Sequence, residues 1–288
     1  MAVKIITDST SDLSKKDLDK YNIDILSLYV TFNGNSVKDA NINNEEFFRR
    51  MENEGIPTSS QPAVGDMMEK MEKALKNGDD LVCVFLSSAL SGTYQSALLV
   101  KDILLDKYPN SSIEMIDSES TSMEMGLAVL EGAKLAKEGK SFKEVVDKIK
   151  STINKTRFIF IPDNLDYLHK GGRIGGAKTL FGNMFKITPI LTVKDKKADI
   201  LQTVRTKRRA KATLIKKLLE DNEKYNVEEV VVHHINAYEE AEKLQEDLEK
   251  EIDVKMQIMD IGPIIGLHVG PKAVGFAYRC EKEIEKDK

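Results

Sequence analysis

The sequence predicts an α/β fold in two domains, an N-terminal domain with a mostly parallel sheet and a C-terminal α+β domain. Strand-like and helix-like segments alternate to about residue 153, which is typical of a doubly wound or related α/β domain. After that point, strand pairs joined by short turns are mixed with two helices. The chain has 288 residues, long for one core and comfortable for two. We place the boundary near residues 155–165 and expect domains of residues 1–158 and 159–288.

The clearest element of the first half is a buried parallel strand at Asp80–Leu86, an unbroken apolar run between Gly78 and Ser87. Val64–Asn77 carries methionine, alanine and leucine at helical spacing and is expected to be an amphipathic helix. The other expected elements are a strand at Val3–Thr7, a helix at Ser14–Tyr21, a strand-like run at Ile23–Phe32 with a turn at 33–35, helices at Asn44–Glu54 and Tyr94–Leu105, a strand at Ser112–Asp117 and a helix at Glu124–Glu138.

The second half is predicted to consist of β-hairpins combined with helices. Lys194–Lys197 is expected to be a hairpin turn between strands at Ile187–Val193 and Ile200–Val204. The segment Gly262–Tyr278 is glycine-rich and apolar. The remaining elements expected here are strands at Phe158–Ile161, Val227–His233 and Val254–Asp260, and helices at Ala210–Glu223 and Ala237–Lys250.

Composition narrows the class of protein. The net charge of −4 gives no global field that would attract nucleic acid or an anionic membrane. The apolar runs fall far short of the ~20 residues that span a bilayer, and no signal-peptide core follows Met1. Of the two cysteines, Cys83 lies in an apolar run and is expected to be a reduced core thiol. Without CxxC or histidine-rich spacing we expect no metal site, and a reducing cytoplasm fits best.

Four clusters of short hydroxyl side chains stand out in the first half: Thr7–Asp12, Pro57–Pro62, Ser87–Thr93 and Asp117–Ser122. Three of them directly follow strand-like runs. In an open α/β sheet the loops at the carboxyl ends of the strands are where ligands bind. Hydroxyl and backbone N–H groups gathered there suit an oxygen-rich anionic group. The first and fourth clusters are expected to cap helices and shape the strand ends.

Two catalytic motifs are incomplete. Gly172–Thr179 nearly spells a P-loop, but Ala177 stands where the second glycine is required and no strand directly precedes it. Ser91-Gly92 resembles a nucleophile elbow without the glycine two residues before the serine. A hydrolase remains an alternative, because His169, His233, His234 and His268 could each supply a base in space.

A lone histidine and a basic run each have both a structural and a functional interpretation. As a structural residue, the lone histidine, His268, would be a satisfied side chain of the fold. His268 lies in the segment of glycines and prolines, where we expect a constrained backbone with little side-chain cover that lets the imidazole reach a ligand. His233 and His234 end a strand and should point to opposite faces, which argues against joint metal binding. The basic run Arg205–Lys211 is either a solvated turn and helix face or a docking site for an anionic partner; few aromatics interleave with it, which disfavours nucleic acid.

Taken together, five segments resemble the DegV family from end to end and in the same order. These are the stretch Thr7–Leu13, Thr58–Pro62, Leu90–Ala97, Lys170–Ile174 and the stretch from Ile261-Gly262-Pro263 to Gly275. The resemblance implies a two-domain, non-catalytic bacterial protein that binds a long-chain fatty acid such as palmitate and needs no cofactor. Some members of that family present the acid to a separate fatty acid kinase, whose product enters phospholipid synthesis.

By position, the resemblance implies that Ser59 and Ser91 bind the fatty-acid carboxylate and that His268 is a further donor. The Ser59 position often has Thr in the family, and Lys272 stands where Gly is common. Arg173 and Arg205 resemble surfaces that could meet the kinase. An acyl chain of ~15 carbons offers about 12 kcal/mol at ~0.8 kcal/mol per methylene, and the helices around Met67–Leu75 and Met123–Leu135 are expected to line its tunnel.

Three functional hypotheses remain open at this point. The first is the fatty-acid carrier. The second is an enzyme, either a Ser/His lipid hydrolase or a phosphotransferase, against which both incomplete motifs count. The third is a binding module without a lipid that uses the basic run from Arg205 to dock a protein or nucleic acid.

Overall fold

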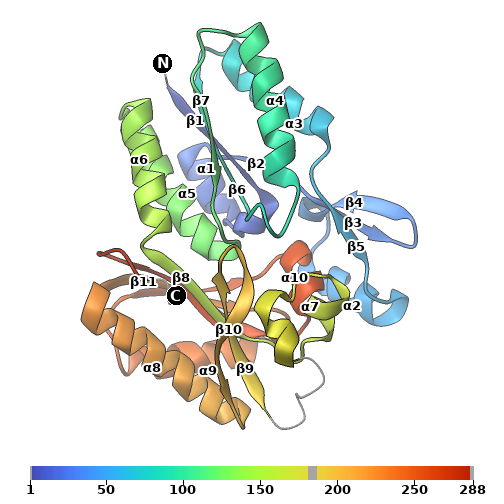
Figure 1. The fold of residues 1–288 in the computed structure, drawn as a ribbon, viewed down its shortest axis with the longest axis vertical. Helices are drawn as coiled ribbons and strands as arrows, with labels where there is room; N and C mark the ends of the chain where they lie inside the picture. Colours follow the sequence, from blue (N-terminus) through green and yellow to red (C-terminus); the bar gives the residue numbers. More distant parts are fainter. Residues whose placement is uncertain (1, 181–186, 286–288) are drawn as a thin grey trace.

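The computed structural model describes residues 2–180 and 187–285. The first half is built on a parallel four-stranded sheet in the order β2-β1-β6-β7, shown in the upper part of Figure 1. Its strands are β1 (Val3–Asp8), β2 (Asp24–Leu26), β6 (Asp80–Phe85) and β7 (Ile113–Asp117). Helices cover both faces, as expected for a parallel sheet.

The two faces of this sheet hold separate cores. On one side α3 (Val64–Lys76) and α4 (Thr93–Lys107) pack over Cys83 and Phe85. On the other, α5 (Ser122–Lys137) and α6 (Phe142–Ile153) pack over Val82 and Val84. Helix α1 (Lys15–Tyr21) lies beside α5 (Figure 1). Successive side chains of β6 point alternately to the two faces of the sheet, so the apolar residues of this strand contribute to both cores.

The second half is built on a six-stranded mixed sheet in the order β10-β9-β8-β13-β11-β12. Only β11 and β12 run parallel; the other neighbours are antiparallel. Helices α8 (Lys207–Tyr225) and α9 (Tyr238–Glu249) pack on one face of it. The strands are β8 (Thr156–Ile161), β9 (Thr188–Lys194), β10 (Lys197–Val204), β11 (Val227–His234), β12 (Lys255–Asp260) and β13 (Val274–Cys280).

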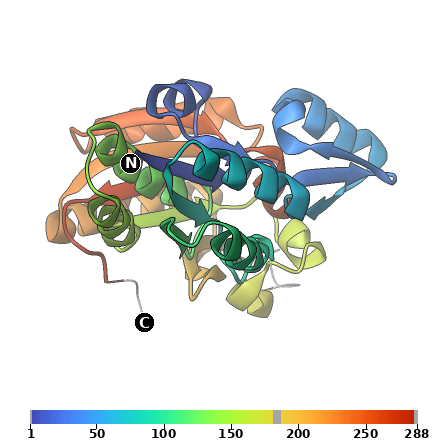
Figure 2. The same cartoon turned by 90° about the horizontal axis from the view of Figure 1, so that it is seen from above.

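Small elements fill the space between the two sheets. A three-stranded antiparallel sheet in the order β4-β3-β5 projects to one side of the first half, as both views show (Figures 1 and 2). Short helices α7 and α10 pack against each other below it. The bounds of these elements are β3 (Tyr29–Phe32), β4 (Asn35–Lys38), β5 (Thr58–Ser60), α2 (Asn44–Glu54), α7 (Asp166–Lys170) and α10 (Pro263–Val269), with single 3₁₀ turns at Ser9–Ser11, Asp39–Asn41 and Gly175–Leu180.

Most expected elements are confirmed to within a few residues, and so is the α/β class. The hairpin turn is confirmed too: Asp195 and Lys196 have φ of 48° and 67°, the paired positive values of a type I′ turn. Cys83 is fully buried, and burial raises the pKa of its thiol to about 12, as expected for an inert core cysteine. The division at residues 158 and 159 stays a prediction; β8 runs across it.

Two expectations about local structure are wrong, and one helix was missed. The run Ile23–Phe32 is not one strand but β2 and β3, in different sheets, because the backbone of Leu28 is held by the Ser9 hydroxyl and by the N–H of Asp39. Residues Thr58–Ser60 are a strand rather than a loop, paired with β3. The helix α6 was not anticipated, although Ser141 and Glu144 form a capping box at its start.

The segment Gly262–Tyr278 also differs from the expectation. It forms α10 and then β13, with Pro263 at the first turn of the helix. His268 therefore lies on a helix and is half-buried, not on an irregular backbone with little cover. Ile264, Ile265 and Leu267 are buried in the same helix. The segment therefore forms an ordinary apolar helix face, which its glycines made difficult to recognise in the sequence.

Candidate ligand-binding site

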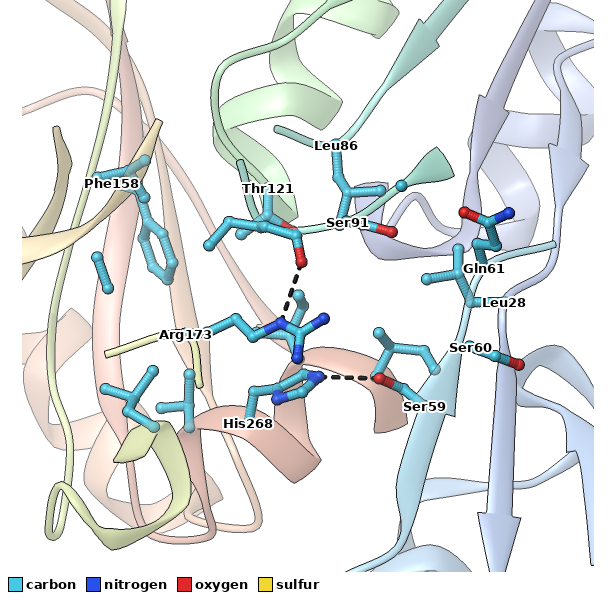
Figure 3. A pocket seen from close by; sticks show the side chains of 18 of the residues that line it. Leu28, Ser59, Ser60, Gln61, Leu86, Ser91, Thr121, Phe158, Arg173 and His268 are labelled. Carbon is cyan, nitrogen blue, oxygen red and sulfur yellow. Dashed lines mark hydrogen bonds between the residues drawn. The ribbon is translucent and has the colours of Figure 1, made fainter. Parts of the chain in front are cut away.

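A cavity of about 250 Å³ lies between the loops of the first half and the face of the second sheet opposite α8 and α9 (Figure 3). Most of its wall is apolar, formed by Leu28, Leu86, Leu90, Phe158, Phe160, Leu168, Val193, Ala198, Ile264, Ile265 and Val269. Its polar lining consists of Ser59, Ser60, Gln61, Ser91, Gly92, Thr121, Arg173 and His268. A mostly apolar cavity with a few convergent polar groups is the usual form of a small-molecule site.

Ser59 and His268 meet across the two halves of the chain. The Ser59 Oγ and His268 Nε2 atoms are 2.9 Å apart (Figure 3). Burial, with a further contribution from the charge of Arg173, lowers the pKa of His268 to about 4, so the ring is neutral at pH 7. A proton on Nε2 would be donated to Ser59 Oγ and would leave the serine hydroxyl free to donate into the cavity.

Ser91 is held by the start of α4. Its Oγ accepts the backbone N–H of Thr93 at 3.3 Å and lies 2.9 Å from Thr93 Oγ1. When Thr93 donates within this hydroxyl pair, the Ser91 O–H is available to a ligand. A Cβ on the neighbouring Gly92 would lie 2.5 Å from the Gln61 amide oxygen, so a side chain there would displace the end of Gln61.

Arg173 reaches across the cavity from the second half. Its Nε donates to the carbonyl of Leu90 at 3.1 Å (Figure 3), and a terminal nitrogen donates to the carbonyl of Gly171 at 2.6 Å. These bonds use two of the five N–H donors of a guanidinium. The site therefore holds a fixed positive charge beside neutral hydroxyl and imidazole groups, which favours an anionic ligand.

Further contacts join the two halves around the cavity. The N–H of Gly262, at the start of α10, donates to Asp12 Oδ1 at 3.0 Å, and the Asn44 side chain donates to the carbonyl of Ile261. At the β9–β10 turn, Ser87 Oγ donates to the carbonyl of Lys196, whose ammonium lies 2.9 Å from Asp117 Oδ2. These polar contacts fix the position of the second half relative to the hydroxyl-rich loops.

The incomplete motifs have structural explanations. In the P-loop-like segment, a Cβ on Gly175 would lie 2.1 Å from the carbonyl of Ala198, and one on Gly176 would lie 2.1 Å from the Asp199 carboxylate. These glycines therefore let the segment approach β10 closely. They follow α7 rather than a strand, so no phosphate-binding strand–loop–helix is formed.

The Ser59–His268 pair is the arrangement in the site that most resembles a hydrolase. Among the described residues, however, His268 Nδ1 has no hydrogen-bond partner, so no carboxylate orients the ring or stabilises an imidazolium. A pKa of about 4 also makes the ring a weak base at neutral pH. Ser91, the residue expected in the incomplete elbow, bonds to Thr93 instead.

The structure brings Ser59, Ser91, His268 and Arg173 together in the cavity wall, while Arg205 is exposed and lies outside it. In the basic run, Lys207 and Lys211 form ion pairs with Asp163 and Glu240. Within residues 2–180 and 187–285, His, Cys, Asp and Glu side chains form no group of three that could hold a metal. In the same ranges, every helix is too short or too polar to span a bilayer.

Sequence reasoning placed the apolar wall on the wrong elements. The methionines of Met67–Leu75 pack in the core between α3, α4 and the first sheet, and none of the cavity-lining residues comes from that range or from Met123–Leu135. The wall comes instead from the face of β8, through Phe158 and Phe160, and from the β9–β10 hairpin. Phe158 and Phe160 are two residues apart, which puts both side chains on one face of β8. This spacing could have identified them from the sequence. Thr121, in the fourth hydroxyl cluster, also lines the cavity.

Comparison with known proteins gives one consistent result. The model of the family described as "Uncharacterised protein, DegV family" matches residues 2–281. A DegV domain-containing protein of Clostridium acetobutylicum is 47% identical over 99% of this chain and 100% of its own length. Its counterpart in Clostridium perfringens is 45% identical over 98% of this chain and 100% of its own.

Solved structures extend the similarity to the fold. A structure described as fatty acid binding of a DegV family protein from Thermus thermophilus has a TM-score of 0.89 and 27% identity, covering 97% of this chain and 100% of that one. A fatty acid (stearic acid)-binding protein from Eubacterium ventriosum has a TM-score of 0.88 and 28% identity, covering 97% and 98%.

Proposed function

Because the chain belongs to the DegV family, we propose that it binds one long-chain fatty acid in the cavity between its two halves. The observation that carries this proposal is the division of the cavity wall, apolar over most of its extent and polar where Ser59, Ser91, His268 and Arg173 converge. Similar structures described as fatty-acid-binding proteins support it.

The carboxylate would lie against the polar part of the wall. The Ser59 and Ser91 hydroxyls would donate to its oxygens, and His268 would orient Ser59 or donate directly through Nε2. Arg173 would balance the charge without pairing fully, because part of its guanidinium is held by backbone carbonyls. Such donors offset the cost of removing a carboxylate from water.

The acyl chain would lie on the apolar wall toward Phe158, which stands across the cavity from Ser59 and Gln61 in Figure 3. Burial of ~15 methylene-sized carbons contributes about 12 kcal/mol gross, reduced by the cost of immobilising a flexible ligand. The protein would act without catalysis or a cofactor, in the cytoplasm. It would present the acid to a separate fatty acid kinase, with Arg173 and Arg205 as contacts for that partner.

Native mass spectrometry of protein purified from a bacterial host tests the binding proposal. We expect a retained mass of one fatty acid per chain, released under denaturing conditions. A ligand-free protein that also takes up neither added palmitate nor oleate would contradict the proposal. Turnover of an acyl ester by the isolated chain would instead favour the hydrolase alternative that the Ser59–His268 pair keeps open.

A further inference from the structure

A buried imidazole lies behind the apolar wall of the cavity. His233 in β11 is 1% exposed, and neither of its ring nitrogens has a hydrogen-bond partner among the described residues. A buried polar group without a hydrogen-bond partner destabilises the folded state, and such groups are rare in folded proteins. Burial lowers the pKa of His233 to about 3, which keeps the ring neutral, with one nitrogen that donates and one that accepts.

His233 faces a small void that shares its wall with the main cavity. The void measures about 10 Å³ and is lined by His233 together with Phe158, Phe160 and Val269, which also line the main cavity. The Phe158 and His233 rings are 5.5 Å apart between centroids. Only this aromatic and aliphatic layer separates the imidazole from the proposed acyl-chain site.

The register of the sheet explains how the void forms. Phe160 in β8 pairs with Gly275 in β13, which pairs with His233 in β11, so the three lie in one row. Paired residues point to the same face of a sheet. Gly275 contributes no side chain to that row, and a Cβ there would lie 2.5 Å from Phe160 Cα. The missing side chain leaves the space between Phe160 and the imidazole.

The void has the size of one hydroxyl group but suits a free water molecule poorly. A volume of about 10–15 Å³ is the least that holds a water, and a buried water needs two to four polar partners. Apart from His233, the side chains that line the void are apolar. A hydroxyl carried on an acyl chain needs fewer partners, because burial of the chain already holds it in place.

We propose that His233 is a second polar recognition point of the ligand site, and that it selects fatty acids with a hydroxyl group in the middle or distal part of the chain. This inference rests on the proposed function, since the acyl chain brings the hydroxyl to the ring. The hydroxyl would enter the void as the acyl chain displaces the Phe160 side chain, and the imidazole would exchange one hydrogen bond with it there. A site built around such a bond discriminates against the analogue that lacks it.

Competitive displacement of a fluorescent fatty acid by four acids tests this proposal. The competitors are stearic acid and its 2-hydroxy, 10-hydroxy and 12-hydroxy derivatives. We expect one of the two mid-chain hydroxy acids to bind about tenfold more tightly than stearic acid, the value of one net hydrogen bond. The 2-hydroxy acid, whose hydroxyl lies beside the carboxylate, should show no such gain through His233.

Two variants separate the role of His233 from a general effect. His233→Leu should remove the preference for the mid-chain hydroxyl and leave stearic acid binding in place. His234→Leu, the matched control on the other face of the same strand, should retain the preference. The comparison of acids on the unaltered protein needs no variant, so a folding defect in His233→Leu cannot obscure the result.

The possible outcomes distinguish failure of the role of His233 from failure of the proposed fatty-acid binding. Stearic acid binding with no gain for either mid-chain hydroxy acid would overturn the role of His233 and leave the fatty-acid site intact. A gain that persists in His233→Leu would also overturn it. Displacement by none of the four acids would remove both proposals together.

Discussion

The two sheets contribute to the cavity in different ways. The N-terminal sheet is covered by helices on both faces and reaches the cavity only through its loops, with Leu86, Ser91 and Thr121 beyond the ends of β6 and β7. The C-terminal sheet is covered by α8 and α9 on one face; on its other face α5 packs against β8 and β13, and another part of that face forms a broad part of the wall.

Because of this difference, the two halves suit different parts of a ligand. Loops at strand ends expose hydroxyls and backbone N–H groups, which suit a charged head group. A sheet face presents adjacent rows of apolar side chains, which suit an acyl chain. Neither half forms the cavity lining alone, because Ser59 from the first half and His268 from the second lie 2.9 Å apart in it.

The largest expected effect follows from removing the hydroxyls of the loop side. Ser59→Ala combined with Ser91→Ala should weaken fatty-acid binding by roughly 2–4 kcal/mol, because a buried carboxylate loses two donors. Isothermal titration with palmitate measures this. Thr58→Ala with Ser88→Ala is the matched control, since each of these residues is close to one of the two serines in the chain but lies outside the cavity wall. Unchanged affinity in the first variant would rule out the assigned head-group site.

Acid stability tests the buried imidazole on the sheet side. The native pKa of His233, about 3, lies below its value of 6.5 in the unfolded chain. The unfolded chain therefore takes up the proton first as the pH falls, and stability present above pH 6.5 is lost below it. At pH 4.5 this contribution amounts to about 2–3 kcal/mol.

Urea unfolding at pH 7.5 and pH 4.5 measures that loss. His233→Leu should lose less stability between the two pH values than the unaltered protein, by about that amount. His169→Leu, which replaces an exposed histidine, should behave like the unaltered protein. Equal pH dependence in all three would show that His233 titrates normally in the folded state.

Blocking the sheet face tests the acyl-chain side. Ala198 is buried in the cavity wall, and Ala198→Phe would exclude about three methylenes, or about 2 kcal/mol. Stearic acid should therefore lose affinity while lauric acid loses little, as titrations of both acids can show. Lys197→Phe, at the exposed neighbouring position, is the control. An unaffected chain-length preference would place the acyl chain elsewhere.

The smallest effect concerns the contact that joins the two sides. The Lys196 ammonium bridges Asp117 and Glu119 and its side chain is 38% exposed, so Lys196→Ala should cost only about 0.5–1 kcal/mol. We expect slightly faster fatty-acid release in stopped-flow measurements, with a difference from the unaltered protein that shrinks in high salt. Lys197→Ala should release at the original rate; a salt-independent difference would show that the ion pair is not responsible.

The sequence by itself determined the fold class, most of the elements and several of the polar residues that line the cavity. Hydrophobic periodicity is local, so the buried strand at Asp80–Phe85 and the helix at Val64–Lys76 could be found from a few neighbouring residues. Ser59, Ser91 and His268 followed from a resemblance that extends over the whole chain.

Only the tertiary structure decided which apolar side chains face the cavity. The methionines of α3 and the phenylalanines of β8 are equally apolar in sequence, but the first pack under α4 and the second face the cavity. The strand-like run is interrupted between Leu26 and Tyr29, because distant groups, the Ser9 hydroxyl and the Asp39 N–H, take the backbone bonds of Leu28. The row of Phe160, Gly275 and His233 depends on pairing between strands far apart in the chain. Such contacts are set by sheet register and packing between the halves, which local periodicity does not encode.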